Sequence, residues 1–417
     1  MLEGESSTRQ RIGGPYLTAD LPGIGGRLRD NLEDFAVEEE LVRAPRGRGR
    51  YAWALIEKRD VSTPDLGRRL GAALRCPAGA FGFAGYKDTR AVARQWVSLP
   101  WRDRDKLSVA RIGGVSLVEL RRDDERMSSR LLAANRFRIV VRGLEDTAGA
   151  RDRAASILRV LERRGVPNFF GPQRFGIRGE SPEVGRCLLG GRFRQALDLI
   201  LGHPSEAELD PRARAFREAY GEGDVRRALQ QVPGALRLEK RLLLRLADGV
   251  PPDRVARQLP ADATRFYLSA WQSLAFNRLL ARRLQAIDKA LPGDLLCGAD
   301  SEIYRCDDPE LESGKVLRWE ASPTGPLFGS NGLLAEGEPG YLERETLAGE
   351  GIDETVFAAR LPVSLLGGRR VLRVPLRGLA IEELASEGAL ALAFTLARGS
   401  FATAVLAEVT KTFAPPL

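Results

Sequence analysis

The sequence predicts an α+β protein in which two regions of strands and packing helices flank a mostly helical region. Three observations support this prediction. The chain has 417 residues, 43% of them hydrophobic, so it is longer than one average domain and can bury a sizeable core. Both ends of the chain alternate apolar and polar residues over short stretches, as strands do. Between about residues 166 and 365 this pattern gives way to helical spacing.

The N-terminal region is expected to contain strands and two helices after a flexible segment at residues 1–20. Alternating residues predict strands at EDFAVEE, at YAWALIEKR (51–59) and at NRFRIVVRGL (135–144). STPDLGRRLGAALR predicts a helix, because Ser62 or Thr63 can cap it and Pro64 fits its first turn. RDRAASILRVLERRG predicts a second helix that ends at Gly165.

The rest of the chain is expected to be helical first and to return to strands at its end. Residues 180–285 have mainly helical spacing, strongest in FYLSAWQSLAFNRLLARRL. Residues 286–350 are expected to be loop-rich, because glycine, proline and acidic residues are frequent there. Strands are expected at 370–376 and 390–398, and GSFATAVLAEVTKTF is expected to form a closing helix capped near Ser400.

Composition narrows the possible chemistry. The formal net charge is +8, carried mostly by arginine, which suits phosphate groups, although a GC-rich genome would enrich arginine as well. The single histidine, His203, follows an apolar helical stretch and precedes Pro204, so a helix-end role is expected, and neither a histidine metal site nor a Ser-His-Asp triad is expected. The four cysteines form no C-x-x-C pair and are expected to be reduced and structural. With no signal-peptide pattern and no apolar stretch of about 20 residues, a soluble cytoplasmic protein is expected.

Asp88 is the main catalytic candidate. It lies in the segment FAGYKDTRAVARQW, in a loop beside Lys87 and Arg90. Nearby positive charge favours an ionised carboxylate, and a positioned carboxylate can attack carbon as a nucleophile. The alternative is an ordinary surface turn with a local ion pair, and these residues alone favour that alternative.

Three phenylalanines and an asparagine are candidates for contact with a nucleobase. Phe35, Phe137 and Phe401 have polar or glycine neighbours, and an aromatic ring can stack on an unpaired base. The alternative is that each ring belongs to the core of its strand or helix. Asn135 can read a base edge through its amide, or simply end a strand.

The segment VPNFFGPQRFGIRG (166–179) interleaves aromatic and basic residues. It places Arg174 and Arg178 beside Phe169 and Phe170, a combination that favours RNA contact. A solvated loop that packs the two phenylalanines inward explains the pattern equally well.

Six ordered segments resemble the TruD family of pseudouridine synthases. FAGYKDTRAVARQW resembles the family signature, an AG-x-KD-x-x-A-V core followed by QW. The other five are RDNLEDFAVEE, NRFRIVVR, VPNFFGPQRFGIRG, FYLSAWQSLAFNRLLARRL and GSFATAVLAEV. Together they cover the chain from about residue 20 to its end.

The resemblance implies a domain organisation. A pseudouridine synthase catalytic domain, with a mixed or antiparallel sheet and packing helices, would comprise residues 21–165 and 366–417. A mostly helical α+β insertion domain, typical of the family, would comprise residues 166–365.

The resemblance also implies site residues. Asp88 would be the nucleophile, and Phe35, Asn135 and Phe401 would line the uridine pocket, with Phe137 nearby. Arg29 stands where relatives often have lysine, so a cation is kept there. Arg29 and Lys87 are further expected substrate-binding residues. Tyr86 departs from the commoner family choices.

The activity implied is the isomerisation of uridine to pseudouridine in tRNA, in this family at position 13. The base is detached from C1′, turned and rejoined through C5, so no cofactor and no metal are expected. RNA is the expected partner, with no membrane, and the protein is expected to be a monomer. Attack of Asp88 on C6, attack on C1′ and a glycal route remain open. The alternative function is a catalytically inactive RNA-binding or RNA-chaperone protein of the same fold.

Overall fold

The computed structural model describes residues 15–358 and 363–412, and the chain divides into two compact units. The sheet unit is formed by Thr18–Val166 and Val374–Thr412, and the inserted unit contains Pro167–Arg373. The short strands β8 (Val166–Pro167) and β13 (Arg373–Val374) lie where the chain passes between the units. The sequence boundaries of the insertion were expected at 166 and 365.

A nine-stranded sheet is the centre of the sheet unit, and its main order is β14-β15-β7-β2-β5-β3-β6. The small strands β1 and β4 pair with β7 and β5, respectively. The pairing of β2 with β5 is parallel and the other pairings are antiparallel, so the sheet is mixed, as expected. Its strands are β1 (Arg27–Leu28), β2 (Phe35–Leu41), β3 (Tyr51–Arg59), β4 (Gly82–Phe83), β5 (Val92–Pro100), β6 (Val115–Asp123), β7 (Leu132–Arg142), β14 (Leu376–Leu384) and β15 (Ala389–Ala397).

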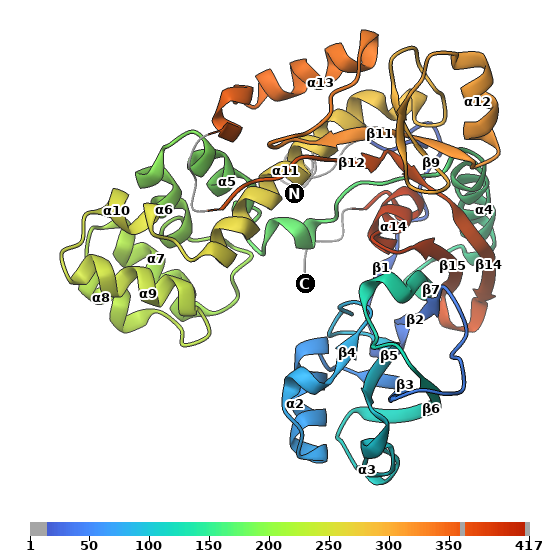
Figure 1. The fold of residues 1–417 in the computed structure, drawn as a ribbon, viewed down its shortest axis with the longest axis horizontal. Helices are drawn as coiled ribbons and strands as arrows, with labels where there is room; N and C mark the ends of the chain where they lie inside the picture. The colour runs from blue at the N-terminus through green and yellow to red at the C-terminus, as the bar shows by residue number, and fades with distance from the viewer. Residues whose placement is uncertain (1–14, 359–362, 413–417) are drawn as a thin grey trace. The chain divides into compact units, whose positions relative to one another are not determined.

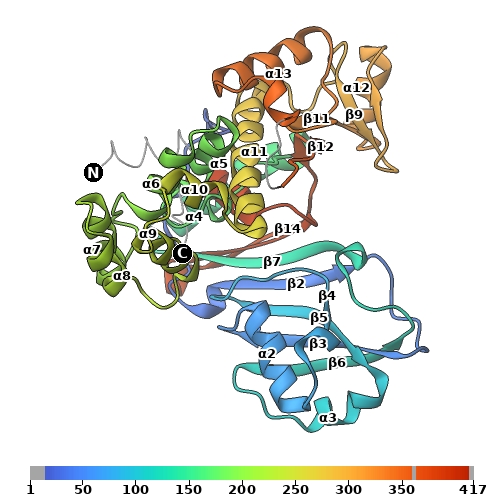
Figure 2. The same cartoon turned by 60° about the vertical axis from the view of Figure 1, so that its left-hand side comes forward.

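Helix α2 (Thr63–Leu74) covers one face of this sheet (Figure 2). Ser62 caps it by accepting a hydrogen bond from the amide of Asp65 at 3.2 Å, as the sequence predicts. Its apolar side packs Leu66 and Leu70 against β3 and β5 residues in one buried cluster. The unit's other helices are α3 (Arg104–Val109), α4 (Thr147–Arg164) and α14 (Ala402–Thr410).

The N-terminal segment expected to be flexible lies mostly outside the described residues, which begin at residue 15. Within its described part, Thr18 is buried, and its hydroxyl donates a hydrogen bond to Glu408 at 2.6 Å. Thr18 also accepts one from the ammonium of Lys411 through its carbonyl, at 2.6 Å. These bonds tie the start of the sheet unit to helix α14.

The inserted unit combines a helical part with a small sheet of order β10-β9-β11-β12 (Figure 1). Trp271 of α11 lies in a large apolar cluster with residues of α5 to α10. The helices are α5 (Ser181–Leu189), α6 (Phe193–Leu201), α7 (Pro211–Gly221), α8 (Val225–Gln231), α9 (Arg237–Ala247), α10 (Pro252–Arg257), α11 (Ala261–Arg283), α12 (Pro309–Leu317) and α13 (Gly337–Gly349). The strands are β9 (Leu295–Gly298), β10 (Ile303–Arg305), β11 (Ala321–Leu327) and β12 (Gly368–Val371).

The expectation of a loop-rich segment at 286–350 is wrong. The segment holds three of the four strands of the small sheet and helices α12 and α13. Strand β11 has the sequence ASPTGPL, whose two prolines and glycine read as turn signals. It is nevertheless a strand, because β9 and β12 pair with it on both sides and its residues Pro323 to Pro326 are buried.

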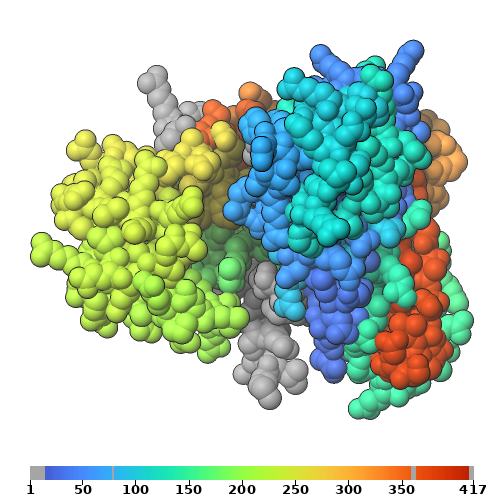
Figure 3. Space-filling view, turned by 90° about the horizontal axis from the view of Figure 1, so that it is seen from below, coloured from blue at the N-terminus to red at the C-terminus, as the bar shows by residue number. Residues whose placement is uncertain are grey.

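Helices α7 to α10 form one rounded surface, drawn in yellow-green in Figure 3.

Among residues 15–358 and 363–412, no helix has both the length and the apolar character that crossing a membrane requires.

Candidate active site

Asp88 lies in the loop between β4 and β5, and its side chain is 32% exposed. Its Oδ2 accepts a hydrogen bond from Nη2 of Arg29 at 2.7 Å. The cation at Asp88 is therefore a residue 59 positions away in the sequence, and not the adjacent Lys87. Within the described part of the chain, no hydrogen bond reaches the second oxygen, Oδ1. The contact orients the carboxylate and leaves one oxygen open to a ligand.

Arg29 is held from two sides. Its guanidinium carbon lies 4.2 Å from the centre of the Phe35 ring, a cation–π contact that complements the ion pair with Asp88. Its backbone has φ 63°, in the left-handed region that a residue with a side chain occupies at a cost of about 1–2 kcal/mol. Such strain persists where surrounding contacts over-determine it, and it concentrates at functional sites.

A row of aromatic rings lies behind Arg29. Phe35 and Phe137 meet edge to face with ring centres 6.1 Å apart, and Phe137 is 5.6 Å from Phe394 of β15. Phe35 and Phe137 are only 5% and 8% exposed. The rings therefore form an apolar wall, and the Phe35 ring supports the guanidinium of Arg29. Their predicted contact with a base stays a prediction.

Asn135 lies beside this row, on the same face of the sheet. It pairs with Glu39 of β2 in the strand register, and it is two residues from Phe137. Its Oδ1 is buried and has no hydrogen-bond partner among the described residues. Leaving a buried polar atom unsatisfied costs about 1–3 kcal/mol, so this oxygen is a ready acceptor for a ligand's N–H.

Phe401 lies directly before helix α14, as its N-terminal cap residue. The pairing of β15 with β7 ends at Ala397 opposite Ala134, which is next to Asn135. Phe401 therefore follows the β15 end that lies beside Asn135. The sequence placed the cap near Ser400, one residue earlier.

Beneath the Asp88 loop lies a buried ion pair. Lys87 and Glu39 have side chains 6% and 0% exposed, and the ammonium lies 2.5 Å from Oε1 of Glu39. The other Glu39 oxygen accepts a hydrogen bond from the amide of Trp96 at 2.7 Å. Burial raises the pKa of Glu39, and the charge of Lys87 opposes that rise. The ammonium of Lys87 thus anchors the loop to β2, while its expected substrate contact remains untested.

Lys58 is the second anchor of the loop. Its side chain, on β3, is fully buried, and its ammonium donates hydrogen bonds to three backbone carbonyls. These belong to Val61 at 2.5 Å, Asp88 at 2.7 Å and Lys87 at 3.4 Å. Burial lowers the pKa of Lys58 to about 8, although the charges of Asp88 and Glu39 act against the change. Lys58 therefore holds the backbone of the residue that carries the candidate nucleophile.

Sequence reasoning missed Lys58 and Glu39, yet the strands contain a signal for both. Each is a charged residue that lies two positions after a buried apolar residue of its strand, Lys58 after Ile56 and Glu39 after Val37, so its side chain points to the same buried face. A charged residue is rarely buried unless it is paired or hydrogen-bonded. A charged residue on the otherwise apolar, buried face of a strand therefore indicates a buried polar network.

Tyr86 stands out for the opposite reason. It is two residues before Asp88 and 83% exposed, the highest exposure of any large hydrophobic side chain described in the sheet unit. An aromatic ring left open to solvent near the candidate nucleophile is a surface on which a base can stack.

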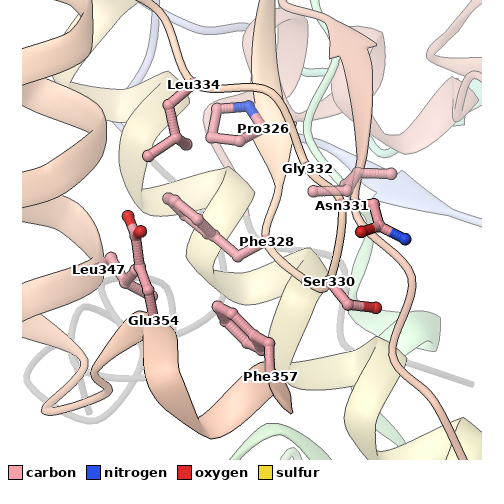
Figure 4. Close-up of a pocket in the computed structure, with 11 residues that line it drawn as sticks. Pro326, Phe328, Ser330, Asn331, Gly332, Leu334, Leu347, Glu354 and Phe357 are labelled. Carbon is pink, nitrogen blue, oxygen red and sulfur yellow. The ribbon is translucent and has the colours of Figure 1, made fainter.

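A cavity of about 440 Å³ lies elsewhere, in the inserted unit (Figure 4). Phe328, Phe357 and Leu347 form its apolar side, and Ser330 and Asn331 line it as well. It contains none of the site residues expected from the sequence. In the described part of the chain, no three His, Cys, Asp or Glu side chains are grouped so that they could hold a metal ion.

Comparison with known proteins gives consistent results over nearly the whole chain. The family model described as tRNA pseudouridine synthase D (TruD) matches residues 11–409. A tRNA pseudouridine synthase D of Geobacter sulfurreducens is 43% identical over 399 residues, which cover 95% of this chain and 96% of the relative. A probable tRNA pseudouridine synthase D of Thermococcus onnurineus is 35% identical, covering 95% of this chain and 97% of the relative.

A solved structure supports the same assignment. The crystal structure of a putative tRNA pseudouridine synthase D from Methanosarcina mazei matches with a TM-score of 0.83 and 28% identity, covering 98% of each chain. The α+β fold expected from the sequence is thereby confirmed. On its sequence and its fold, the chain belongs to the tRNA pseudouridine synthase D (TruD) family.

Proposed function

We propose that this protein isomerises uridine to pseudouridine in tRNA, with Asp88 as the nucleophile, and that its target is position 13, as the family resemblance implies. The observation that carries the proposal is the contact of Arg29 with Asp88, which orients a partly exposed carboxylate and leaves its Oδ1 open. Membership of the TruD family supplies the substrate class.

The reaction requires little beyond what these residues offer. The N1–C1′ bond breaks, a C5–C1′ bond forms, the hydrogen on C5 leaves to solvent and N1 gains a proton. One carboxylate acts as the nucleophile, and the rest of the site holds the base while it turns. The base must also leave its stack, at a cost of a few kcal/mol that contacts in the site offset.

Asn135 is proposed to hold the uracil by its edge. Its buried Oδ1 has no described partner, and the N3–H of uracil is a donor of the matching kind. The wall formed by Phe35 and Phe137 would exclude water from the turning base. Phe401 is proposed to close the pocket on the side of helix α14.

The test uses tRNA carrying tritium at C5 of its uridines, because isomerisation releases that hydrogen. Wild-type protein should release tritium and give pseudouridine at position 13 on chemical mapping. Asp88→Asn keeps the side chain's size and removes the nucleophile, so it should release none. Undiminished release by Asp88→Asn would contradict the proposed role of Asp88.

The second candidate function is an RNA-binding or RNA-chaperone protein of the same fold without catalysis. The Arg29–Asp88 contact weighs against it, because RNA binding alone does not need a carboxylate in the loop. Tight binding of tRNA by wild-type protein, with neither tritium release nor pseudouridine under any condition, would favour this candidate instead.

A further inference from the structure

Two arginines of the inserted unit converge on one aromatic ring. The guanidinium carbon of Arg370, on β12, lies 4.1 Å from the centre of the Phe170 ring, and that of Arg174 lies 6.0 Å from it. The Phe170 ring is fixed by an edge-to-face contact with Phe276 of α11 at 5.7 Å. The backbone amide of Phe170 donates a hydrogen bond to Oδ1 of Asn277 at 2.8 Å, and the Phe170 carbonyl accepts one from Nδ2 of Asn277 at 3.0 Å. The two positive groups thus share a rigid support.

Arg174 has no acidic partner among the described residues. The hydrogen bond described for it runs from Nε to the hydroxyl of Ser273, at 3.2 Å. Arg370 donates to the carbonyl and side-chain oxygens of Asn168, which are neutral acceptors. Burial, followed by the positive charge of Arg174, lowers the pKa of Arg370 to about 10, and burial lowers the pKa of Arg174. Two like charges are therefore held together and half-buried, at an energetic cost to the folded protein.

The neighbouring Arg178 shows what a structural arginine looks like in the same segment. Its guanidinium pairs with Glu180 at 2.8 Å and donates to the carbonyls of Leu199, Ile200 and Gly202 at the end of helix α6. Arg369, next to Arg370, is likewise paired with Glu343 at 2.8 Å. Arg174 differs from both in lacking a carboxylate.

We propose that Arg174 and Arg370, supported on Phe170, form a binding site for a backbone phosphate of the RNA substrate. The site rests on the proposed function for its ligand, but it lies outside the residues proposed to act on uridine. A phosphodiester carries the negative charge that Arg174 lacks among the described residues, and a guanidinium binds two of its oxygens through parallel N–H groups. The hydroxyl of Ser273 keeps Arg174 in place from the side of α11.

The site makes opposite predictions for binding and for stability. Arg174→Gln should weaken tRNA binding by about tenfold, the loss expected for a charged hydrogen bond. The slope of log affinity against log salt should become shallower by about 0.7 to 0.9, which corresponds to one phosphate contact. The thermal unfolding midpoint should stay the same or rise, because the substitution relieves repulsion with Arg370. A purely structural role for Arg174 predicts the reverse, a lower midpoint with unchanged binding.

Arg318→Gln is the matched control. It removes the same charge from the same unit, but Arg318 is exposed and paired with Glu320 at 2.8 Å. An equal loss of affinity in both variants would mean that only overall charge matters, which would overturn the site. Unchanged affinity and salt slope in Arg174→Gln would overturn it as well.

The experiment is run as equilibrium binding of tRNA to the full-length chain carrying Asp88→Asn, so that turnover does not enter. The proposed function and the site can then fail separately, because binding to this variant reports on the site alone, whereas tritium release by the protein with Asp88 intact reports on the function. A parallel titration with inorganic phosphate tests the other source of the same chemistry. If phosphate raises the unfolding midpoint in an Arg174-dependent manner while tRNA affinity is independent of Arg174, the site is one for free anions and the RNA proposal is wrong.

Discussion

Arg29 performs two tasks with one side chain: its guanidinium orients Asp88 through Nη2, and its flat face rests on Phe35. A lysine at this position keeps the charge, but its ammonium is a compact group that cannot lie on the ring and form the same directed bond. The geometry therefore favours arginine at this position.

Substitution of Arg29 should separate charge from geometry. Arg29→Lys is expected to retain part of the activity, whereas Arg29→Gln should lower kcat by about 10²-fold, because a misplaced catalytic group has an effect of this size. Single-turnover rates at saturating tRNA measure both. Equal rates for Arg29→Gln and wild type would show that Asp88 does not depend on this contact.

Tyr86 should act on binding and leave the chemical step alone. Loss of one stacking contact costs about 1–3 kcal/mol, so Tyr86→Ala should raise KM by about 5- to 150-fold with little change in kcat. Tyr86→Phe keeps the ring and is the control, with a KM close to that of wild type. If Tyr86→Phe behaves like Tyr86→Ala, the hydroxyl is the important group and stacking is not.

At the scale of elements, the Asp88 loop is held by side chains from two strands and a helix. Lys58 of β3 holds its carbonyls, Glu39 of β2 holds the side chain of Lys87, and Thr63 of α2 accepts a hydrogen bond from the Lys87 amide at 2.9 Å. The pairing of β5 with β2 and with β3 brings Glu39 and Lys58 to the loop that precedes β5. The loop is thus fixed to the sheet and to the first turn of α2.

The pKa of Lys58 predicts a pH dependence of this attachment. Above about pH 8 the amine is neutral and keeps two N–H donors for three carbonyls, so the loop loosens and the single-turnover rate should fall. The stability contribution has the opposite sign. Between about pH 8 and pH 10.5, Lys58 binds a proton more often in the unfolded chain than in the folded one. The contribution of Lys58 to the free energy of unfolding therefore rises with pH in this range.

Lys58→Met provides the comparison. Its rate should be lower than that of wild type below pH 8, and the inflection near pH 8 should disappear. Ionisation of uridine itself affects both proteins equally. The same inflection in Lys58→Met would assign it to another group.

The sequence predicts elements better than it predicts the contacts between them. Strand β3 coincides with the predicted 51–59, and the cap of α2 is Ser62, because both follow from local alternation and local hydrogen bonds. The contact of Arg29 with Asp88 joins residues 59 positions apart and depends on strand order, which local patterns do not encode. For the same reason, β11 was missed: its prolines are tolerated only because of its neighbours in the sheet.

At the scale of the whole molecule, the sheet unit is formed by two distant parts of the chain. All nine strands of its sheet and helices α2, α3, α4 and α14 belong to it. Each of the residues proposed to contact uridine also lies in it. The inserted unit has an apolar core of its own.

Excision of the inserted unit tests this independence. Replacement of Pro167–Arg373 by a flexible glycine-serine linker should leave a protein that unfolds in one cooperative thermal transition. It should also lose the part of the salt dependence of tRNA binding assigned to Arg174. Thermal unfolding is measured by circular dichroism. Absence of a cooperative transition would show that the sheet unit needs the insertion to fold.

The strand order has a consequence for the ribosome-bound chain. One edge of β7 pairs with β2, which is synthesised before β7. The other edge pairs with β15, which is synthesised only after the whole inserted unit. Roughly 230 residues separate β7 from the β14–β15 hairpin, which at typical translation speeds is a wait of about 10–50 s. During that time the nascent sheet carries an open edge. Arg136 and Arg138, which alternate with the buried residues of β7, are charges of the kind that discourage another nascent chain from adding to such an edge.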